Sequence, residues 1–126
     1  MFNSKALSGR KGEALAAEFL KKNGYRIIAL NYRTKLGEID IIAEDKPTLC
    51  FIEVKLRSSD RFGLPQEAVS PKKQAQIAKA ALLFLKENRL IDKDARFDIV
   101  AVLDKGGQAA FELIKNAFEL NGEYSY

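Results

Sequence analysis

Apolar and polar positions along residues 36–56 predict two β-strands, Leu36–Ala43 and Leu49–Leu56, joined by a turn. A register symmetric about the Lys46-Pro47 bond pairs apolar residues on one face of this hairpin: Ile39 with Val54, Ile41 with Ile52 and Ala43 with Cys50. A slip of one residue would set apolar side chains against polar ones, so the pattern fixes the parity of the register. Because proline cannot adopt positive φ, we expect a four-residue loop, Asp45–Thr48, and not a two-residue turn.

Apolar periodicity and the positions of glycine and proline predict two helices. The first covers Leu7–Asn23 and ends before Gly24, and the second is capped by Ser70, has Pro71 at its first position and ends near Asn88. Three further strands are predicted over Tyr25–Leu30, Phe97–Leu103 and Ala109–Ile114. The strand–helix–strand order indicates a parallel pair. No linker or repeat divides the chain, so residues 1–126 are expected to form a single α/β domain.

The composition removes several classes of active site. The chain has no histidine, so a Ser-His-Asp triad and a histidine metal site are excluded. The single cysteine, Cys50, excludes disulfide and cysteine zinc sites, and its apolar neighbours predict a buried side chain. A metal site would therefore use carboxylates, which suit Mg²⁺ or Mn²⁺. The chain has neither an apolar segment of membrane-spanning length nor a signal-peptide core, so we expect a cytoplasmic protein without a membrane partner.

The polar face of the predicted hairpin gathers four charged residues. The same register sets Asp40 opposite Glu53 and Glu38 opposite Lys55, with about 5 Å between opposed Cβ atoms. Opposed carboxylates repel unless a cation lies between them, and Lys55 could then contact a water or phosphate oxygen beside this metal. Such a set suits phosphodiester hydrolysis, because the metal polarises the phosphoryl oxygen and acidifies a bound water. The spacing fits equally well an exposed Glu38–Lys55 ion pair beside a solvated polar edge.

The strand sequences Gly37-Glu38-Ile39-Asp40 and Phe51-Ile52-Glu53-Val54-Lys55 resemble the core motif of the PD-(D/E)XK nuclease superfamily, with Ile39 where the motif has its proline. More of the chain is similar to the YraN family of small bacterial proteins, predicted endonucleases that are distantly similar to archaeal Holliday junction resolvases. The further residues of this similarity are Gly12-Glu13, Asn31-Tyr32-Arg33, Arg57, Phe62-Gly63, Lys72-Lys73, Arg96-Phe97-Asp98 and Ile114-Lys115-Asn116-Ala117-Phe118. The resemblance implies a restriction-endonuclease-like fold, in which helices flank a mixed central β-sheet.

The resemblance also implies a role for each matching residue. Asp40 and Glu53 correspond to the metal-binding carboxylates, with the Val54 carbonyl as a further ligand. Lys55 corresponds to the catalytic lysine. Glu13 corresponds to the helix glutamate that completes the metal shell in resolvase-like members, although the helix pattern alone fits an exposed glutamate equally well.

Three cations and one amide near the predicted site are candidates for binding a nucleic-acid backbone. Arg57 shares the face of Lys55 and could hold a phosphate or pair with a carboxylate. Lys73 lies at a helix N-terminus, where the helix dipole disfavours a cation, and a bound phosphate or a snorkelling side chain would each relieve this conflict. Gln76 borders the same helix face. Arg33, just before the motif strand, could follow a backbone or be a solvated loop charge.

Other notable residues are expected to be structural. Arg96 and Asp98 are predicted to form an ion pair at the end of an inner strand, and Lys21-Lys22 is predicted to be a solvated helix face. Phe62-Gly63 indicates a loop that could shape the cleft, since glycine allows unusual backbone angles.

Two functions of different classes follow from these patterns. The first is a metal-dependent endonuclease that hydrolyses phosphodiester bonds in DNA, with branched or structured DNA as a candidate substrate. Glu38 would then anchor Lys55 or support the metal ligands from outside. The second is a non-catalytic nucleic-acid-binding or interaction module on a nuclease scaffold. DNA is the expected partner, the net charge of +4 is compatible with it, and cutting both strands of a junction would favour a homodimer.

Overall fold

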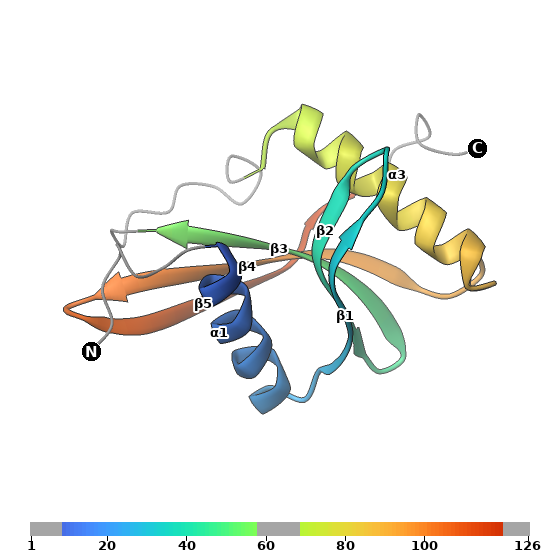
Figure 1. Ribbon diagram of the computed structural model, residues 1–126. Helices are drawn as coiled ribbons and strands as arrows, with labels where there is room; N and C mark the ends of the chain where they lie inside the picture. The colour runs from blue at the N-terminus through green and yellow to red at the C-terminus, as the bar shows by residue number, and fades with distance from the viewer. Residues whose placement is uncertain (1–8, 58–68, 120–126) are drawn as a thin grey trace.

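The computed structural model describes residues 9–57 and 69–119, which fold into helices and strands in the arrangement of Figure 1. The elements are α1 (Gly9–Lys22), β1 (Arg26–Arg33), β2 (Glu38–Asp45), β3 (Thr48–Arg57), α3 (Pro71–Glu87), β4 (Ala95–Lys105) and β5 (Gln108–Phe118). Every element that the sequence predicts is present, with ends that differ by a few residues. The predicted loop at Phe62-Gly63 lies outside the described residues.

The strands form one sheet in the order β1-β2-β3-β4-β5. β3 and β4 run parallel, as the strand–helix–strand order predicts, and the other neighbouring pairs are antiparallel. The sheet is therefore mixed, and the two helices pack on it. This arrangement confirms the expected α/β fold with a mixed central sheet flanked by helices.

α1 and α3 cover opposite faces of the sheet. Successive side chains of a strand point to opposite sides, so alternate residues of one strand pack against different helices. Leu49 and Phe51 of β3 pack in one core with the buried face of α3, whereas Cys50 and Ile52 pack in a second core with α1. Cys50 is fully buried, as its neighbours predict. The same double coverage explains why residues 97–103 of β4 are almost continuously apolar. Figure 1 shows α1 and α3 lying apart, with strands between them.

The β2–β3 turn is shorter than the sequence suggests. The two strands pair from Ile41↔Ile52 to Asp45↔Thr48, which leaves only Lys46 and Pro47 as connecting residues. The Lys46-Pro47 peptide bond is cis. The predicted four-residue loop was therefore wrong, while the predicted parity of the register is confirmed.

Helix ends follow the capping signals in the sequence. Gly24 follows the end of α1, and its φ of +89° is the left-handed conformation in which helices commonly terminate. At the start of α3, the Lys73 N–H donates to the Ser70 hydroxyl at 3.2 Å, and Pro71 occupies the first helical position. These caps fix where α3 begins, and therefore where its first-turn side chains lie relative to β3.

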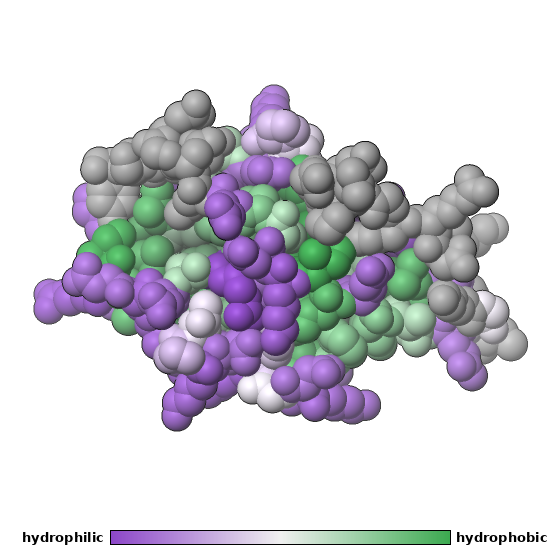
Figure 2. Space-filling view, turned by 180° about the vertical axis from the view of Figure 1, so that it is seen from behind, coloured by the Kyte–Doolittle hydropathy of each residue, from purple (hydrophilic) through white to green (hydrophobic). Residues whose placement is uncertain are grey.

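Figure 2 shows the side of the molecule that faces away in Figure 1. A polar band crosses the middle of this side, and apolar patches lie next to it. In residues 9–57 and 69–119, no helix is long and apolar enough to cross a membrane.

Candidate active site

Asp40 lies where β2 and β3 separate. Their pairing ends at Ile41↔Ile52, and the Val54 N–H donates to Asp40 Oδ2 at 2.9 Å, so a carboxylate oxygen accepts the bond that a backbone carbonyl accepts elsewhere in the ladder. Asp40 and Glu53 were expected to face each other as ladder partners. The ladder ends one pair earlier, at Ile41↔Ile52, so this expectation was wrong. The side chain of Asp40 occupies the opening between the strands, and this contact fixes its position.

Glu53 is the most buried acidic side chain near this opening. It is only 7 % exposed, and it follows Phe51 on the side of β3 that faces α3. The pKa of Glu53 is raised to about 8, mainly by burial and next by the negative charge of Asp40, while the charges of Lys73 and Lys55 act in the opposite direction. The carboxyl group therefore lies beside one carboxylate and two ammonium groups from three elements.

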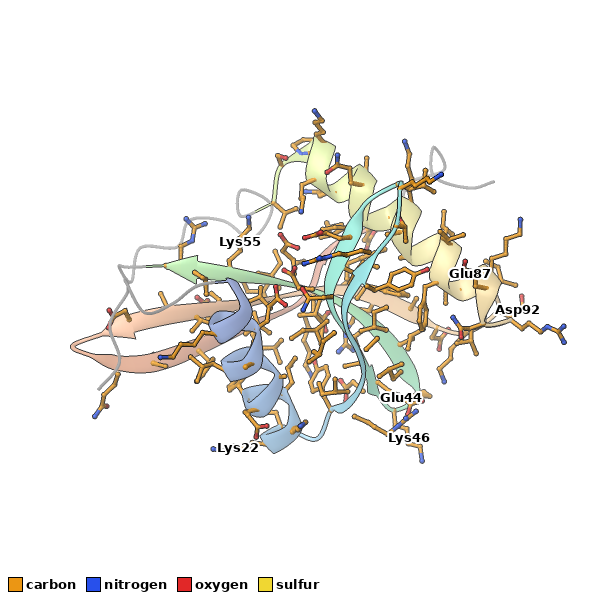
Figure 3. The ribbon with its side chains drawn as sticks, in the orientation of Figure 1. Lys22, Glu44, Lys46, Lys55, Glu87 and Asp92 are labelled. Carbon is orange, nitrogen blue, oxygen red and sulfur yellow. The ribbon has the colours of Figure 1, made fainter. Side chains whose placement is uncertain are left out.

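Lys55 is held by Glu53 and not by Glu38. The distance from Lys55 Nζ to Glu53 Oε2 is 3.8 Å, and the lysine side chain is about one-third exposed. Glu38 instead lies 3.7 Å from Arg33 Nε, and both of these side chains are exposed. The predicted Glu38–Lys55 pairing was wrong because β2 and β3 have already separated at these residues. Figure 3 shows Lys55 far from Lys46, which lies at the turn of the same hairpin.

Glu13 approaches the same opening from α1. The helix passes close to β3 at Gly12, where a Cβ atom would collide with the side chain of Leu56. Burial raises the pKa of Glu13, the charge of Asp40 raises it further, and a hydrogen bond with Asn31 lowers it. The helix pattern allowed Glu13 to be either exposed or directed towards the sheet. In the structure it is directed towards the sheet.

Other candidate residues surround this group at different distances. Lys73, in the first turn of α3, acts electrostatically on Glu53. The Gln76 carbonyl contacts the β1–β2 turn, and its side chain is half-buried. Arg57 is half-buried two residues beyond Lys55 on β3, whereas Arg33 is exposed on β1.

Glu13, Asp40 and Glu53 together offer only oxygen donors, which fit a hard ion such as Mg²⁺ or Mn²⁺. Two of their oxygens, Glu13 Oε1 and Glu53 Oε1, are buried and accept no hydrogen bond from the described part of the chain. Within the described part of the chain, no group of three acidic or cysteine side chains is already arranged so that it could hold a metal ion. A bound ion would therefore have to draw these carboxylates together.

Sequence reasoning matched Asn31, Gly12 and Gly37 to the family but assigned no role to any of them. Asn31 has φ of +53°, a conformation that asparagine tolerates better than most residues, and it forms the hydrogen bond to Glu13. Gly12 and Gly37 allow close packing of α1 on β3 and of the β1–β2 turn on α3. Glycine inside an apolar helix pattern or just before a strand is the one signal that could have indicated these contacts.

A second polar cluster forms around fully buried Asp98 of β4, which pairs with Ile52 of β3. Its oxygens accept hydrogen bonds from Arg96 at 2.8 and 3.0 Å, from the Asn116 N–H at 2.9 Å and from the Tyr25 hydroxyl at 3.3 Å. Arg96 also pairs with Asp45 at 3.0 Å. The predicted Arg96–Asp98 ion pair is confirmed, and the filled acceptors of Asp98 indicate a structural role.

Comparison with known proteins identifies the family of this chain. The model of the uncharacterised protein family UPF0102 matches residues 12–102. The chain belongs to UPF0102. A UPF0102 protein of Syntrophus aciditrophicus is 53 % identical over 113 residues, which are 90 % of this chain and 89 % of the relative. A UPF0102 protein of Desulfosudis oleivorans is 48 % identical over 96 % of this chain and 97 % of its own length.

A further relative covers nearly the whole chain. A UPF0102 protein of Acetivibrio thermocellus is 47 % identical over 92 % of this chain and 94 % of the relative. The residues that match the UPF0102 model include all the candidate site residues, from Glu13 in α1 to Gln76 in α3. The candidate site thus lies within the part of the chain that defines the family.

Proposed function

We propose that this UPF0102 protein is a metal-dependent endonuclease that hydrolyses phosphodiester bonds in DNA. One observation carries the proposal: the buried carboxyl group of Glu53 lies in the electrostatic reach of Asp40 and 3.8 Å from the ammonium group of Lys55. Burying a carboxylate beside another carboxylate costs stability, so its retention favours a functional explanation. The resemblance of the two strands to the PD-(D/E)XK motif supports the same chemistry.

Each residue of the site has a role in this proposal. Asp40, Glu53 and Glu13 would hold Mg²⁺ or Mn²⁺, with the Val54 carbonyl as a further ligand. Such an ion, when bound, polarises a phosphoryl oxygen and lowers the pKa of a bound water. Lys55 would donate hydrogen bonds to the attacking water and to the phosphoryl oxygen on which negative charge develops. The water would lose a proton to solvent as its oxygen bonds to phosphorus, and the leaving oxygen would take up a proton from solvent as its own bond to phosphorus breaks.

Residues around the carboxylates would bind the DNA backbone. Lys73 and Arg57 lie near the site and would contact phosphates on either side of the scissile bond, with Gln76 at the border of this surface. Arg33 would contact a more distant phosphate, and Glu38 would orient Arg33 through the ion pair that joins them. Two copies of the chain would be needed to cut both strands of a junction, which favours a homodimer on such a substrate.

A second candidate function is a nucleic-acid-binding module without catalysis. It is favoured by one observation, that no three acidic side chains in the described ranges are already grouped as a metal site. A nuclease-like fold does not by itself fix activity. Binding of DNA without cleavage, in the presence of Mn²⁺, would identify this second function.

The two candidates are separated by cleavage of a labelled substrate panel in Mn²⁺. The panel holds single-stranded, duplex, flap and four-way-junction DNA with matching RNA. We expect wild type to cut at least one DNA and Lys55→Ala to cut none. Lys46→Ala is the matched control, because Lys46 is an exposed lysine at the opposite end of the same hairpin, and it should cut as wild type does (Figure 3). Binding without cutting by wild type would reject the nuclease.

A further inference from the structure

The turn between β1 and β2, residues Thr34–Gly37, is held rigidly by one side chain. The Thr34 hydroxyl donates to the Gly37 carbonyl at 2.8 Å and accepts from the N–H groups of Leu36 and Gly37, both at 3.0 Å. The Thr34 N–H also donates to the Gly37 carbonyl at 2.9 Å. Four hydrogen bonds therefore fix the shape of a four-residue turn.

The same turn is anchored on the helix that borders the candidate site. A Cβ atom at Gly37 would lie 2.5 Å from the Gln76 carbonyl oxygen, so backbone meets backbone there and no other residue fits without movement. Gln76 follows Lys73 by about one helical turn. Figure 1 shows the tip of the β1–β2 hairpin beside α3. The turn is thus a fixed part of the surface around the carboxylates.

This rigid turn presents a large apolar side chain to solvent next to an exposed lysine, with the Arg33–Glu38 ion pair at its base. Leu36 is 50 % exposed, Lys35 beside it is exposed, and Arg33 reaches outward from the end of β1. An exposed leucine next to cations that could contact phosphates resembles the apolar wedges that proteins insert between stacked bases.

The distance to the candidate site suits that use. Leu36 precedes Asp40 by four residues, and because even an extended strand rises only about 3.3 Å per residue, the two residues lie at most about 13 Å apart. That length corresponds to about four base steps at 3.4 Å each. A side chain at the tip would therefore act on bases close to a phosphate bound at the carboxylates.

We propose that Leu36 is a wedge that inserts at an unstacked base step near the scissile phosphate, with Arg33 and Lys35 holding the flanking backbone. This inference rests on the proposed nuclease function and names its substrate class: DNA with a branch point, an unpaired base or a similar break in stacking. Such DNA has already lost the stacking that a wedge must disrupt, so it binds the tip at lower cost than an intact duplex.

Fluorescence of 2-aminopurine tests the wedge directly, because the signal of this base rises when it is unstacked. The probe is placed at the branch point of a flap DNA and, separately, inside an intact duplex, with Ca²⁺ replacing Mn²⁺ to slow cleavage. We expect wild type to raise the signal at the branch, Leu36→Ala to lose most of this rise, and Leu36→Phe to keep it. Ile91→Ala is the control, since Ile91 is an equally exposed residue (49 %) between α3 and β4.

Cleavage by the same variants in Mn²⁺ separates the wedge from the proposed chemistry. We expect Leu36→Ala to lower the preference for flap over duplex DNA about tenfold in kcat/KM. If wild type cuts DNA and Leu36→Ala keeps both the preference and the fluorescence rise, the wedge is wrong and the nuclease stands. If wild type raises the signal but cuts nothing, the wedge stands and the nuclease is wrong. Loss of a dimer in Leu36→Ala, seen by sedimentation with no change in fluorescence, would show a protein interface and reject the wedge.

Discussion

At the scale of single residues, Glu53 is the position where stability and proposed function conflict. Its carboxyl group is almost fully buried near the carboxylate of Asp40, and one of its oxygens accepts no hydrogen bond from the described residues. A buried acid without a complete set of partners resists ionisation, and an ion or a proton can each relieve this penalty. The metal-free protein should therefore reveal the conflict through its dependence on pH.

We expect the metal-free protein to lose stability as pH rises. The pKa of Glu53 is near 4.5 in the unfolded chain and is raised to about 8 in the folded protein. Between these values the folded state binds more protons, so the free energy of unfolding falls by about 1.4 kcal/mol per pH unit for each full proton of difference. Thermal melts with a chelator from pH 5 to 9 measure this slope. Glu53→Gln should flatten it, and an unchanged slope in this variant would contradict the assignment.

Asp40 has a structural contact that can be separated from its charge. Its Oδ2 accepts the hydrogen bond of the Val54 N–H, so Asp40→Ala leaves a donor without its partner and should cost about 1–3 kcal/mol of folding free energy. Asp40→Asn keeps an acceptor oxygen and should cost less than Asp40→Ala. Urea unfolding in the absence of metal measures both. Equal losses in the two variants would show that the contact does not stabilise the opening between β2 and β3.

At the scale of elements, the site depends on close packing at two glycines. Gly37→Ala would place a Cβ atom against the backbone carbonyl of Gln76, which cannot rotate away, and we expect a loss of about 1–3 kcal/mol. Gly12→Ala meets the end of the flexible Leu56 side chain instead and should cost less. Denaturant unfolding of both variants gives the comparison. If Gly12→Ala proves the more damaging of the two, the β1–β2 turn is not anchored on α3 as described.

The elements themselves were predictable because each rests on a local signal. Gly24, Ser70 and Pro71 set helix ends, and apolar pairs fixed the register parity of the β2–β3 hairpin. The point where these strands separate was not predictable, because it depends on the Asp40 side chain bonding to Val54 across the ladder. Glu53 and Lys55 lie two residues apart on one strand, so their proximity could be predicted. The predicted partner of Glu38 was wrong because it depended on pairing beyond the point where the strands separate.

At the scale of the whole molecule, the two-sided sheet explains how distant segments reach one opening. α1 packs on one face and brings Glu13, and α3 packs on the other and brings Lys73. β2 and β3 separate between the two helices, next to Asp40 and the buried Glu53. None of these contacts is local in sequence except that between Glu53 and Lys55. The site is therefore a product of the fold, which is consistent with its position inside the span shared by the UPF0102 family.

Calorimetric titration of Mn²⁺ into the protein tests most directly whether this opening holds a metal ion. Wild type should bind Mn²⁺ and release protons, because bound carboxyl groups must be ionised. Glu53→Gln should bind at least about tenfold more weakly, since it removes a charged ligand. Glu18→Gln, an exposed change on the same helix as Glu13, should bind as wild type does. Absence of binding to wild type, or equal binding to Glu53→Gln, would contradict the proposed metal site.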